Sequence, residues 1–349
     1  MTRITVPPTM MERVEHIPTS SVPLIRTLDV PPFIHAHDVV GPNAMTFGAA
    51  LIEAVASAFI EGIEVSITQA ALAVWQPRHP YVTDAGRTVA AALSATQDAV
   101  SGSASYADHS TAHSRLMRAQ RTPRFAGFRK SIVRVSDHVA PAPRRIAELM
   151  HDLSLFIATR DDTVVHAAIA HAQFETIHPY ADGNGRIGRA LLSGHMGIPI
   201  SRYLARHRQD YYDALRDFRL GDATAIVDIV GAAALDGFEL IENTYDDDSY
   251  PFETDDLADL SPETREVANR IRLTPVGTRW KMTRNGKALT SAFEEMLDAG
   301  IITRVSRTGE HEVFAYLPVV NAWADEAVID TRVRAQSAHS WKRALSVHV

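Results

Sequence analysis

The sequence predicts a mainly α-helical protein with one short β-hairpin and a small α+β domain at its C-terminal end. Three observations support this fold class. Apolar residues recur at helical spacing over most of residues 46–241. One alternating, β-branched stretch at 131–135 interrupts them and favours a strand. An acidic linker at 242–260 then precedes a second, shorter run of helices and strands, which indicates a domain boundary.

The composition is that of an ordinary globular protein and excludes several kinds of site. The 349 residues include no cysteine, so disulfides, thiolate zinc sites and cysteine nucleophiles are excluded. The net charge of -7 gives no general attraction to nucleic acid or to an anionic membrane. No stretch reaches the roughly 20 apolar residues that cross a bilayer, and the N-terminus does not resemble a signal peptide. We therefore expect a cytoplasmic protein without membrane contact.

The elements of the first half follow in order. Residues 1–43 contain repeated prolines, and we expect an N-terminal arm extended over the surface. A helix is expected at 46–62, where Gly62 is suited to end it, and Ser57 and Glu61 share one face because they lie four residues apart. The next expected elements are helical residues 66–117 with breaks at Gln76-Pro77 and Gly102, the strand or hairpin at 131–135, and helices at 145–157, 163–177 and twice within 200–241.

The C-terminal domain is expected at residues 261–330, followed by a tail at 331–349. Its elements are a helix at 265–271, a helix at 289–300, a strand at 301–305, a turn at 307–310 and a strand at 313–317. This order suggests a winged helix. Six Lys or Arg stand against five acids between residues 279 and 312, so attraction to DNA would be weak. Contacts with protein, including those of a homodimer, are at least as well supported as DNA binding.

The chemistry is concentrated in residues 178–189, His-Pro-Tyr-Ala-Asp-Gly-Asn-Gly-Arg-Ile-Gly-Arg, a loop between two helices. Glycines on both sides of Asn184 allow positive φ and turn backbone N–H groups toward an anion, which the start of the next helix also favours. Two arginines one turn apart suit a polyphosphate. We therefore expect a phosphate site made by Gly183, Asn184, Gly185, Arg186 and Arg189.

Two further residues of the loop indicate catalysis. Asp182 is a hard oxygen ligand of the kind that holds Mg²⁺ together with substrate phosphates. His178, at the end of a helix, is suited to act as a general base near neutral pH. Each residue type alone is more often structural, and the prediction rests on their coincidence in one loop.

Two other patterns in this region are typical of different kinds of site. Gly183, Gly185 and Gly188 spell G-x-G-x-x-G, but a dinucleotide-binding loop follows a strand and this one follows a helical stretch. Glu148 with His151 and Glu175 with His178 form two Glu-x-x-His pairs, as in di-metal carboxylate bundles. That arrangement requires uninterrupted helices, whereas the second pair runs directly into a proline and a glycine turn.

The loop closely resembles the signature of the Fic family, His-Pro-Phe-x-Asp/Glu-Gly-Asn-Gly-Arg-x-x-Arg, and only Tyr180 departs from it. The resemblance spans about residues 45–240 and implies a Fic-type helical catalytic domain at 44–241. Family members mostly transfer AMP from ATP to a hydroxyl of a target protein. The resemblance implies that His178 deprotonates that hydroxyl, that Asp182 holds Mg²⁺, that the glycines and Arg186 hold the phosphates, and that Arg189 binds the γ-phosphate.

The resemblance extends to three other places. Ser57-Ala-Phe-Ile-Glu61-Gly62 fits the family's inhibitory pattern, which implies that Glu61 pairs with Arg189 and leaves ATP bound unproductively. Residues 131–135, namely Ser131, Ile132, Val133, Arg134 and Val135, stand where the family carries a flap that aligns the target segment. Tyr211 and Tyr212 resemble a paired-tyrosine position, and Tyr211 is expected either to border the nucleotide or to belong to the core.

The sequence therefore predicts an autoinhibited protein adenylyltransferase that uses ATP and Mg²⁺ and modifies a Ser, Thr or Tyr hydroxyl of a target protein or of itself. A second hypothesis is transfer of another group, such as UMP or a phosphate. Gly183 favours a nucleotidyl group, because a phosphate-transferring relative has lysine at this position. The third hypothesis is a winged-helix regulator that binds DNA and only senses ATP.

Overall fold

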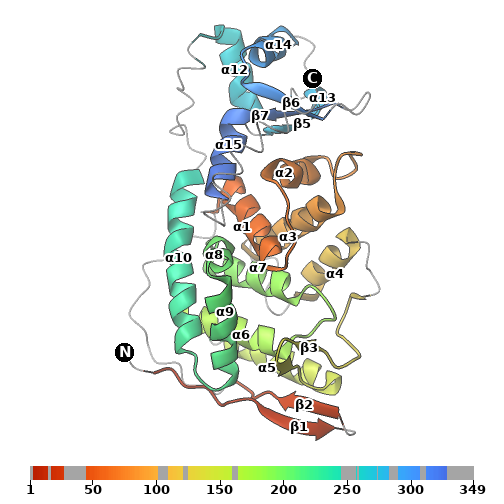
Figure 1. Ribbon diagram of the computed structural model, residues 1–349, viewed down its shortest axis with the longest axis vertical. Coiled ribbons are helices and arrows are strands. Elements are labelled where there is room, and N and C mark those ends of the chain that lie inside the picture. The colour runs from red at the N-terminus through yellow and green to blue at the C-terminus, as the bar shows by residue number, and fades with distance from the viewer. Residues whose placement is uncertain are drawn as a thin grey trace.

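A computed structural model describes residues 3–14, 17–26, 45–100, 109–120, 125–158, 164–244, 257, 259–272, 274–282, 290–306 and 312–327. Gly102, residues 245–256 of the expected linker, the turn at 307–310 and the tail at 331–349 lie outside these residues. The fold is mainly helical and elongated, with the C-terminal elements at one end and the first two strands at the other (Figure 1).

The helices of the first part are α1 (Phe47–Ile60), α2 (Ile67–Trp75), α3 (Asp84–Val100), α4 (His109–Ala119), α5 (Ile146–Ala158), α6 (Val164–Ile177), α7 (Asn184–Met196), α8 (Ser201–Arg206), α9 (Arg208–Arg219) and α10 (Thr224–Thr244). A short 3-10 helix, η2 (Pro143–Arg145), precedes α5. The two helices expected within residues 200–241 correspond to α9 and α10, whereas α8 was not anticipated. His207 breaks the run between α8 and α9 with a non-helical backbone.

Helix α1 lies in the interior and contacts α3, α8 and α7. Thr46 caps it, since its hydroxyl accepts from the N–H of Ala49 at 3.1 Å. Gly62 follows its end with φ of +76°, and its N–H bonds the carbonyl of Phe59 at 2.9 Å. Apolar residues on all sides explain why the helix is buried along nearly its whole length. Its C-terminal turn is thereby fixed relative to α7.

Helices α6 and α7 form the centre of the fold and hold the loop at 178–183 between them. α6 is buried from Val165 to Ile177. A Cβ atom at Gly188 in α7 would stand 2.2 Å from Glu175 Oε1 in α6, so only glycine allows this close approach. The N-terminal turn of α7 is therefore held against the end of α6.

The N-terminal region differs from the extended surface arm that the prolines predict. β1 (Met10–Val14) pairs antiparallel with β2 (Ile17–Ser21), with Met10 opposite Ser21. Flanking apolar residues are buried, namely Ile4, Val6, Val22 and Ile25. Pro18 is tolerated because both strands of a two-stranded sheet are edge strands. The expectation of an arm without regular structure is wrong for these residues.

The second hairpin is shorter than the sequence predicts. β3 (Arg134–Val135) pairs antiparallel with β4 (His138–Val139), and Ser136 at the turn has φ of +56°. The prediction of a strand is correct for Arg134 and Val135 and wrong for residues 131–133, which lead into it without ladder pairing. The backbone of Val133 still contacts the hairpin, since its carbonyl accepts from the N–H of Ala140 at 3.0 Å.

The C-terminal elements are α12 (Pro262–Ile271), β5 (Val276–Gly277), α13 (Arg279–Met282), α14 (Thr290–Asp298), β6 (Ile302–Ser306), β7 (Val313–Tyr316) and α15 (Leu317–Glu326). The strands form one antiparallel sheet in the order β5-β7-β6. The two expected helices and two expected strands correspond to α12, α14, β6 and β7, whereas β5, α13 and α15 were not anticipated. The winged-helix interpretation stays a prediction.

Helix α15 returns to the first part of the chain and packs on α1. A Cβ atom at Gly48 would stand 2.3 Å from Nε1 of Trp323, and the Trp323 ring lies 5.7 Å from that of Phe47. Thr278 and Gln76 add a pair of hydrogen bonds at 2.9 and 3.3 Å between their two regions. The C-terminal elements therefore rest directly on the N-terminal turn of α1.

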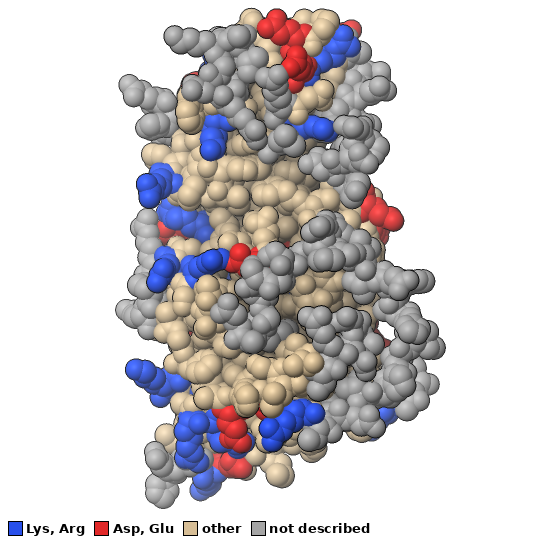
Figure 2. All heavy atoms as spheres, turned by 180° about the vertical axis from the view of Figure 1, so that it is seen from behind, with Lys and Arg blue, Asp and Glu red and all other residues tan. Residues whose placement is uncertain are grey.

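Among the residues that the structure describes on the rear face, the Lys, Arg, Asp and Glu side chains lie mainly along the edges and at the two ends (Figure 2). No helix among the described residues is both long enough and apolar enough to cross a bilayer.

Candidate active site

The loop between α6 and α7 is closed by its own side chains. His178 has φ of +50°, which is uncommon for a residue with a side chain, and its N–H bonds the carbonyl of Phe174 at 2.9 Å. The Asn184 amide bonds the backbone of Tyr180 twice, accepting from its N–H at 2.8 Å and donating to its carbonyl at 2.9 Å. The side chain of Asn184 therefore holds the loop, and its backbone N–H remains the group that can face a ligand.

The His178 ring is poised as a neutral base. Burial lowers its pKa to about 4, although the backbone carbonyl of Glu175 favours the protonated ring. The positive charge of Arg129 lowers this pKa further. Because the pKa lies well below 7, the imidazole is unprotonated near neutral pH and can accept a proton.

Asp182 stands at the outer side of the loop, with its side chain 46% exposed. Its Oδ1 accepts from the N–H of Gly183 at 2.6 Å and from Nη2 of Arg186 at 3.0 Å. Its Oδ2 accepts no hydrogen bond among the described residues. One carboxylate oxygen is thus used to fix the side chain, and the other remains available to a cation.

The two glycines around Asn184 have different roles. Gly183 has φ of +83° and precedes the first residue of α7, as expected for a turn of N–H groups. Gly185 is already helical, so the prediction of positive φ on both sides of Asn184 is wrong for this glycine. Its missing side chain instead makes room, because a Cβ atom there would stand 2.3 Å from Glu61 Oε1 and 2.9 Å from Arg189 Nη1.

Arg186 is buried beside the start of α7. Nη2 donates to Asp182, and the amide oxygen of Gln120, in the orientation that satisfies both groups, accepts from the same nitrogen at 3.2 Å. Burial lowers the pKa of Arg186, although Asp182 and Glu61 oppose the shift. The guanidinium keeps its charge at neutral pH and provides a fixed positive group at the helix N-terminus.

Arg189 is 1% exposed, and its side chain donates hydrogen bonds to α1 and to the residue after it. Its Nε donates to the Ser57 hydroxyl at 3.0 Å, and its Nη2 donates to the Ser57 carbonyl at 2.9 Å and to Glu61 Oε1 at 2.7 Å. Burial opposes ionisation of Glu61, but the Arg189 charge outweighs it and lowers the pKa of that carboxyl. The same pair raises the pKa of Arg189 despite its burial. Both groups are therefore ionised at neutral pH.

The residues that surround this loop match a known family. Residues 104–195 match the model of the Fic/DOC family. The chain contains a Fic/DOC family domain. Curated relatives include the Protein adenylyltransferase Fic of Nematostella vectensis, 35% identical over 112 residues, which are 30% of this chain and 26% of that protein. The protein of the same name from Aedes aegypti is 35% identical over 107 residues, 29% of this chain and 21% of that protein.

The matched part is limited, since the aligned residues span about a quarter of the length of these curated relatives. Among solved structures, a Fic family protein from Desulfovibrio desulfuricans G20 is 22% identical and covers 76% of this chain and 86% of that chain, with a TM-score of 0.47. Fic-1 from C. elegans is also 22% identical and covers 59% of this chain and 67% of that chain, with a TM-score of 0.49. Helix α1, with Ser57 and Glu61, lies outside the part of the chain that matches the Fic/DOC model.

The two tyrosines of α9 lie at different depths beside the Fic/DOC domain. Tyr211 is buried, and its hydroxyl bonds Nε2 of His171 at 2.8 Å behind Arg189. Tyr212 is 42% exposed, and its hydroxyl donates to the carbonyl of Ile60 at 3.1 Å, at the end of α1. The structure thus gives Tyr211 a core position, and contact with a nucleotide base stays a prediction.

Arg129 is a site residue that the sequence did not reveal. Nε donates to the His178 carbonyl at 2.8 Å, Nη1 to the Ser131 carbonyl at 2.9 Å, and Nη2 to the carbonyls of Pro141 at 2.6 Å and Ile177 at 3.3 Å. Burial lowers its pKa to about 10, so it remains charged at neutral pH. One guanidinium thus joins the loop of the Fic/DOC domain to the segment before β3. The acceptors of Arg129 are backbone carbonyls, so no spacing of side chains in the sequence indicates them.

Two histidines of α4 also support the loop. The His113 ring stacks on Tyr180 with centroids 3.5 Å apart, and its Nε2 donates to the Asp182 carbonyl at 2.8 Å. The His109 Nδ1 atom bonds the Tyr180 hydroxyl. This hydrogen bond satisfies the buried hydroxyl that distinguishes Tyr180 from the phenylalanine of the usual Fic signature.

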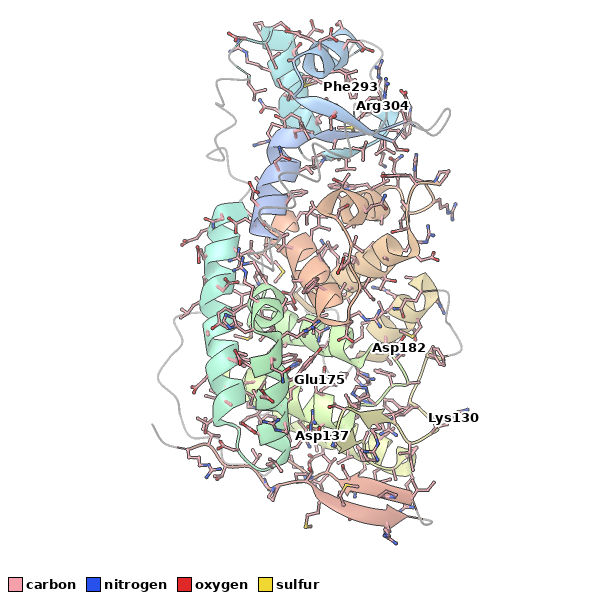
Figure 3. The ribbon with its side chains drawn as sticks, viewed as in Figure 1. Lys130, Asp137, Glu175, Asp182, Phe293 and Arg304 are labelled. Carbon is pink, nitrogen blue, oxygen red and sulfur yellow. The ribbon has the colours of Figure 1, made fainter. Side chains whose placement is uncertain are left out.

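Glu175 is a buried residue of α6 that lies farther from the edge of the molecule than Asp182 does (Figure 3), and no hydrogen bond satisfies its Oε1 among the described residues. Burial raises its pKa to about 7, although the nearby Arg189 charge opposes the shift. It does not form a di-metal site with His178, Glu148 and His151, because the part of the chain that the structure describes contains no group of three or more such metal-binding side chains. Of the two Glu-x-x-His pairs, the one formed by Glu175 and His178 thus contains a buried carboxyl.

Proposed function

We propose that the chain is an autoinhibited protein adenylyltransferase that transfers AMP from ATP to a Ser, Thr or Tyr hydroxyl of a target protein or of itself. The observation that carries the proposal is the arrangement at the start of α7. A neutral His178, a partly exposed Asp182 and two buried arginines converge there on one helix N-terminus. The Fic/DOC domain and the names of the curated relatives support the same reaction.

In the proposed reaction, His178 accepts the proton of the target hydroxyl. The hydroxyl oxygen then bonds the α-phosphorus, and the bond from that phosphorus to the oxygen that bridges to the β-phosphate breaks. Pyrophosphate leaves with the electron pair of this bond. The backbone N–H groups at Gly183 to Gly185 and the Arg186 charge stabilise the negative charge on the phosphates, and Arg189 binds the γ-phosphate when Glu61 releases it.

Asp182 fits the role of a Mg²⁺ ligand. One of its oxygens is fixed by Gly183 and Arg186, whereas Oδ2 accepts no bond among the described residues. A single protein carboxylate suffices for Mg²⁺, since this ion takes its other ligands from water and substrate phosphates. When bound, the ion neutralises phosphate charge during transfer.

We further propose that Glu61 inhibits the enzyme. In the structure, Glu61 occupies one hydrogen-bonding site on Arg189, the side chain proposed to bind the γ-phosphate. ATP that binds while Glu61 remains in place lacks this contact, so its α-phosphate is not aligned for attack. Inhibition thus acts through the position of one side chain.

Incubation of purified variants with ATP labelled at the α-phosphate, together with Mg²⁺ and cell lysate, tests both parts of the proposal. Glu61→Gly is expected to raise labelling of protein by about tenfold or more, because it frees Arg189. The matched control is Glu64→Gly, which removes an exposed glutamate from the segment after α1 and is expected to leave labelling unchanged. Adding His178→Ala to Glu61→Gly should abolish labelling.

Absence of label from Glu61→Gly, on itself and on every lysate protein, would overturn the proposal. A parallel reaction with α-labelled UTP, and one with γ-labelled ATP, distinguishes AMP transfer from transfer of another nucleotide or of phosphate. Gly183 supports a nucleotidyl group, because its φ of +83° and its contacts with Leu116 and Met117 disfavour any side chain. Helix α14 carries Glu294, Glu295 and Asp298, so its charge opposes an approach to DNA and we do not extend the proposal to DNA binding.

A further inference from the structure

A long segment before and within the flap carries charge of only one sign. Residues 109–136 contain seven basic residues and no Asp or Glu, in a chain whose net charge is -7. The basic residues are Arg115, Arg118, Arg121, Arg124, Arg129, Lys130 and Arg134. Each of these charges that the structure describes is either bonded within the fold or exposed to a partner.

The described parts of this segment form one wall of the candidate active site. His113 in α4 donates to the carbonyl of Asp182, Gln120 contacts Arg186, and Arg129 donates to the carbonyl of His178. The segment therefore contacts the loop at three places: at His178, which is the proposed general base, at Asp182, and at Arg186 of the proposed phosphate site. A target segment whose hydroxyl reached His178 would lie next to this wall.

The charges of this wall fall into two groups. Arg129 is buried among carbonyls and Arg115 pairs with Asp98, so both are used within the fold. The other described cations, Arg118, Lys130 and Arg134, are exposed and have no acidic partner among the described residues. Figure 3 shows Lys130 at the rim, on the same side of the molecule as Asp182.

Acidic groups nearby do not cancel these three charges. Asp137, at the tip of the hairpin, lies 3.6 Å from Arg219, and Asp182 is paired with Arg186. ATP also does not account for the exposed cations, because the proposed phosphate site uses the buried Arg186 and Arg189. Exposed charges act on an approaching partner over about 8 to 10 Å at physiological salt. Arg118, Lys130 and Arg134 are thus free to attract an anionic partner.

We propose that these three residues recognise an acidic target segment, that is, a protein segment with Asp or Glu beside the modified hydroxyl. This inference rests on the proposed function and deepens it by naming the substrate class. Strand β3 pairs only with β4 among the described strands, which leaves its second edge without a strand partner. A segment lying there would place its acidic side chains near Lys130 and Arg134.

The test measures binding, so that it does not depend on catalysis. Fluorescent synthetic peptides with one central Ser, Thr or Tyr, flanked by Glu, Ala or Lys, are titrated with the full-length Glu61→Gly protein, and anisotropy gives each Kd. The Glu-flanked peptides are expected to bind at least about tenfold more tightly than the Lys-flanked ones, and added salt should reduce the difference. A single-stranded oligonucleotide is included as a second kind of anion.

Charge-reversal variants assign the effect to the wall. Lys130→Glu with Arg134→Glu is expected to remove or reverse the preference for Glu-flanked peptides. Arg78→Glu with Arg265→Glu makes the same change at exposed positions outside the wall and should leave the preference intact. Equal binding of the three peptides, an unaffected preference in the first double variant, or tighter binding of the oligonucleotide would overturn the inference.

The result is separable from the test of the proposed function. Labelling of protein by α-labelled ATP without a charge preference among peptides would refute the acidic target and leave AMP transfer standing. A preference for Glu-flanked peptides that depends on Lys130 and Arg134, without any label transfer, would support the acidic target and refute AMP transfer.

Discussion

Gly185 and Glu61 are packed so closely that a Cβ atom on Gly185 would stand 2.3 Å from Oε1 of Glu61. The first turn of α7 and the end of α1 meet at this point, and the contact leaves room for the ion pair between Glu61 and Arg189. The absent side chain at position 185 thus serves the proposed inhibitory contact as well as the proposed phosphate site.

Gly185→Ala is expected to lower the free energy of unfolding by about 1 to 3 kcal/mol, because the new methyl group clashes with Glu61 and Arg189. Glu61→Gly removes one of the two clashing groups, so the same alanine should cost less in that background. Thermal or denaturant unfolding of the wild type, both single variants and the double variant measures this coupling. Simple additivity of the two single effects would contradict the described packing.

Glu175→Gln is expected to change how stability depends on pH. Folding raises the pKa of Glu175 from 4.5 to about 7, so the folded state binds this proton more tightly than the unfolded state. The contribution of Glu175 to the free energy of unfolding is fully present below about pH 4.5. It is lost as the pH rises through 7, and the total loss is roughly 3 kcal/mol. The glutamine variant lacks this loss, so its melting temperature relative to the wild type should rise between about pH 5 and pH 8.

Glu148→Gln is the matched control for that experiment. Glu148 has a side chain that is 54% exposed and pairs with Arg145 on the surface of α5. We expect its difference from the wild type to stay constant over the same pH range. A parallel response of the two variants would show that Glu175 does not titrate as its burial implies.

Arg129→Lys is expected to weaken both the fold and the proposed catalysis. Lysine keeps the charge but cannot reach the four carbonyls that the planar guanidinium contacts, so about 2 to 4 kcal/mol of stability should be lost. Because the contact to the His178 carbonyl positions the base, kcat in the Glu61→Gly background should fall more than KM for ATP changes. Arg145→Lys, at an exposed pair, should alter stability by less than about 0.5 kcal/mol.

Gly48→Ala is expected to disturb the contact between α1 and α15. The added methyl group would overlap Trp323, whose ring atoms would be 2.3 to 3.0 Å from it, and should cost about 1 to 3 kcal/mol. Gly231→Ala in α10 is the control, because the nearest atom there, Val164 Cγ1, is 3.8 Å away. That substitution should be neutral or should stabilise by up to about 1 kcal/mol through helix propensity. Melting curves recorded by tryptophan fluorescence compare the two.

Local patterns were sufficient to predict part of this molecule. The spacing of apolar residues located α1 and α6, and the loop at 178–189 was predicted between two helices. These features depend on residues close together in sequence. The β1–β2 hairpin was not predicted, because prolines hide the pairing of edge strands from any propensity argument.

The parts of the site that the sequence did not reveal depend on distant contacts. Arg129 contacts backbone carbonyls, which every residue has, so nothing in the pattern marks its partners. Gly185 was predicted to need positive φ, whereas its role is set by Glu61 on another helix. The raised pKa of Glu175 follows from burial, which a helix with apolar residues on all its sides does not disclose.

The three hydrogen bonds that Arg189 donates to α1 and its C-cap do not all go to the same residue. Ser57 accepts two of them, through its hydroxyl and its backbone carbonyl, and Glu61 accepts the third. Glu61 is the C-cap residue that directly follows α1, and Gly62 comes next with φ of +76°. Rotation of the Glu61 side chain away from Arg189 would therefore free one hydrogen-bonding site of the guanidinium, while the bonds to Ser57 would keep its orientation. Under the proposed function, activation needs no departure of the helix, because the same helix that withholds the arginine also sets its direction.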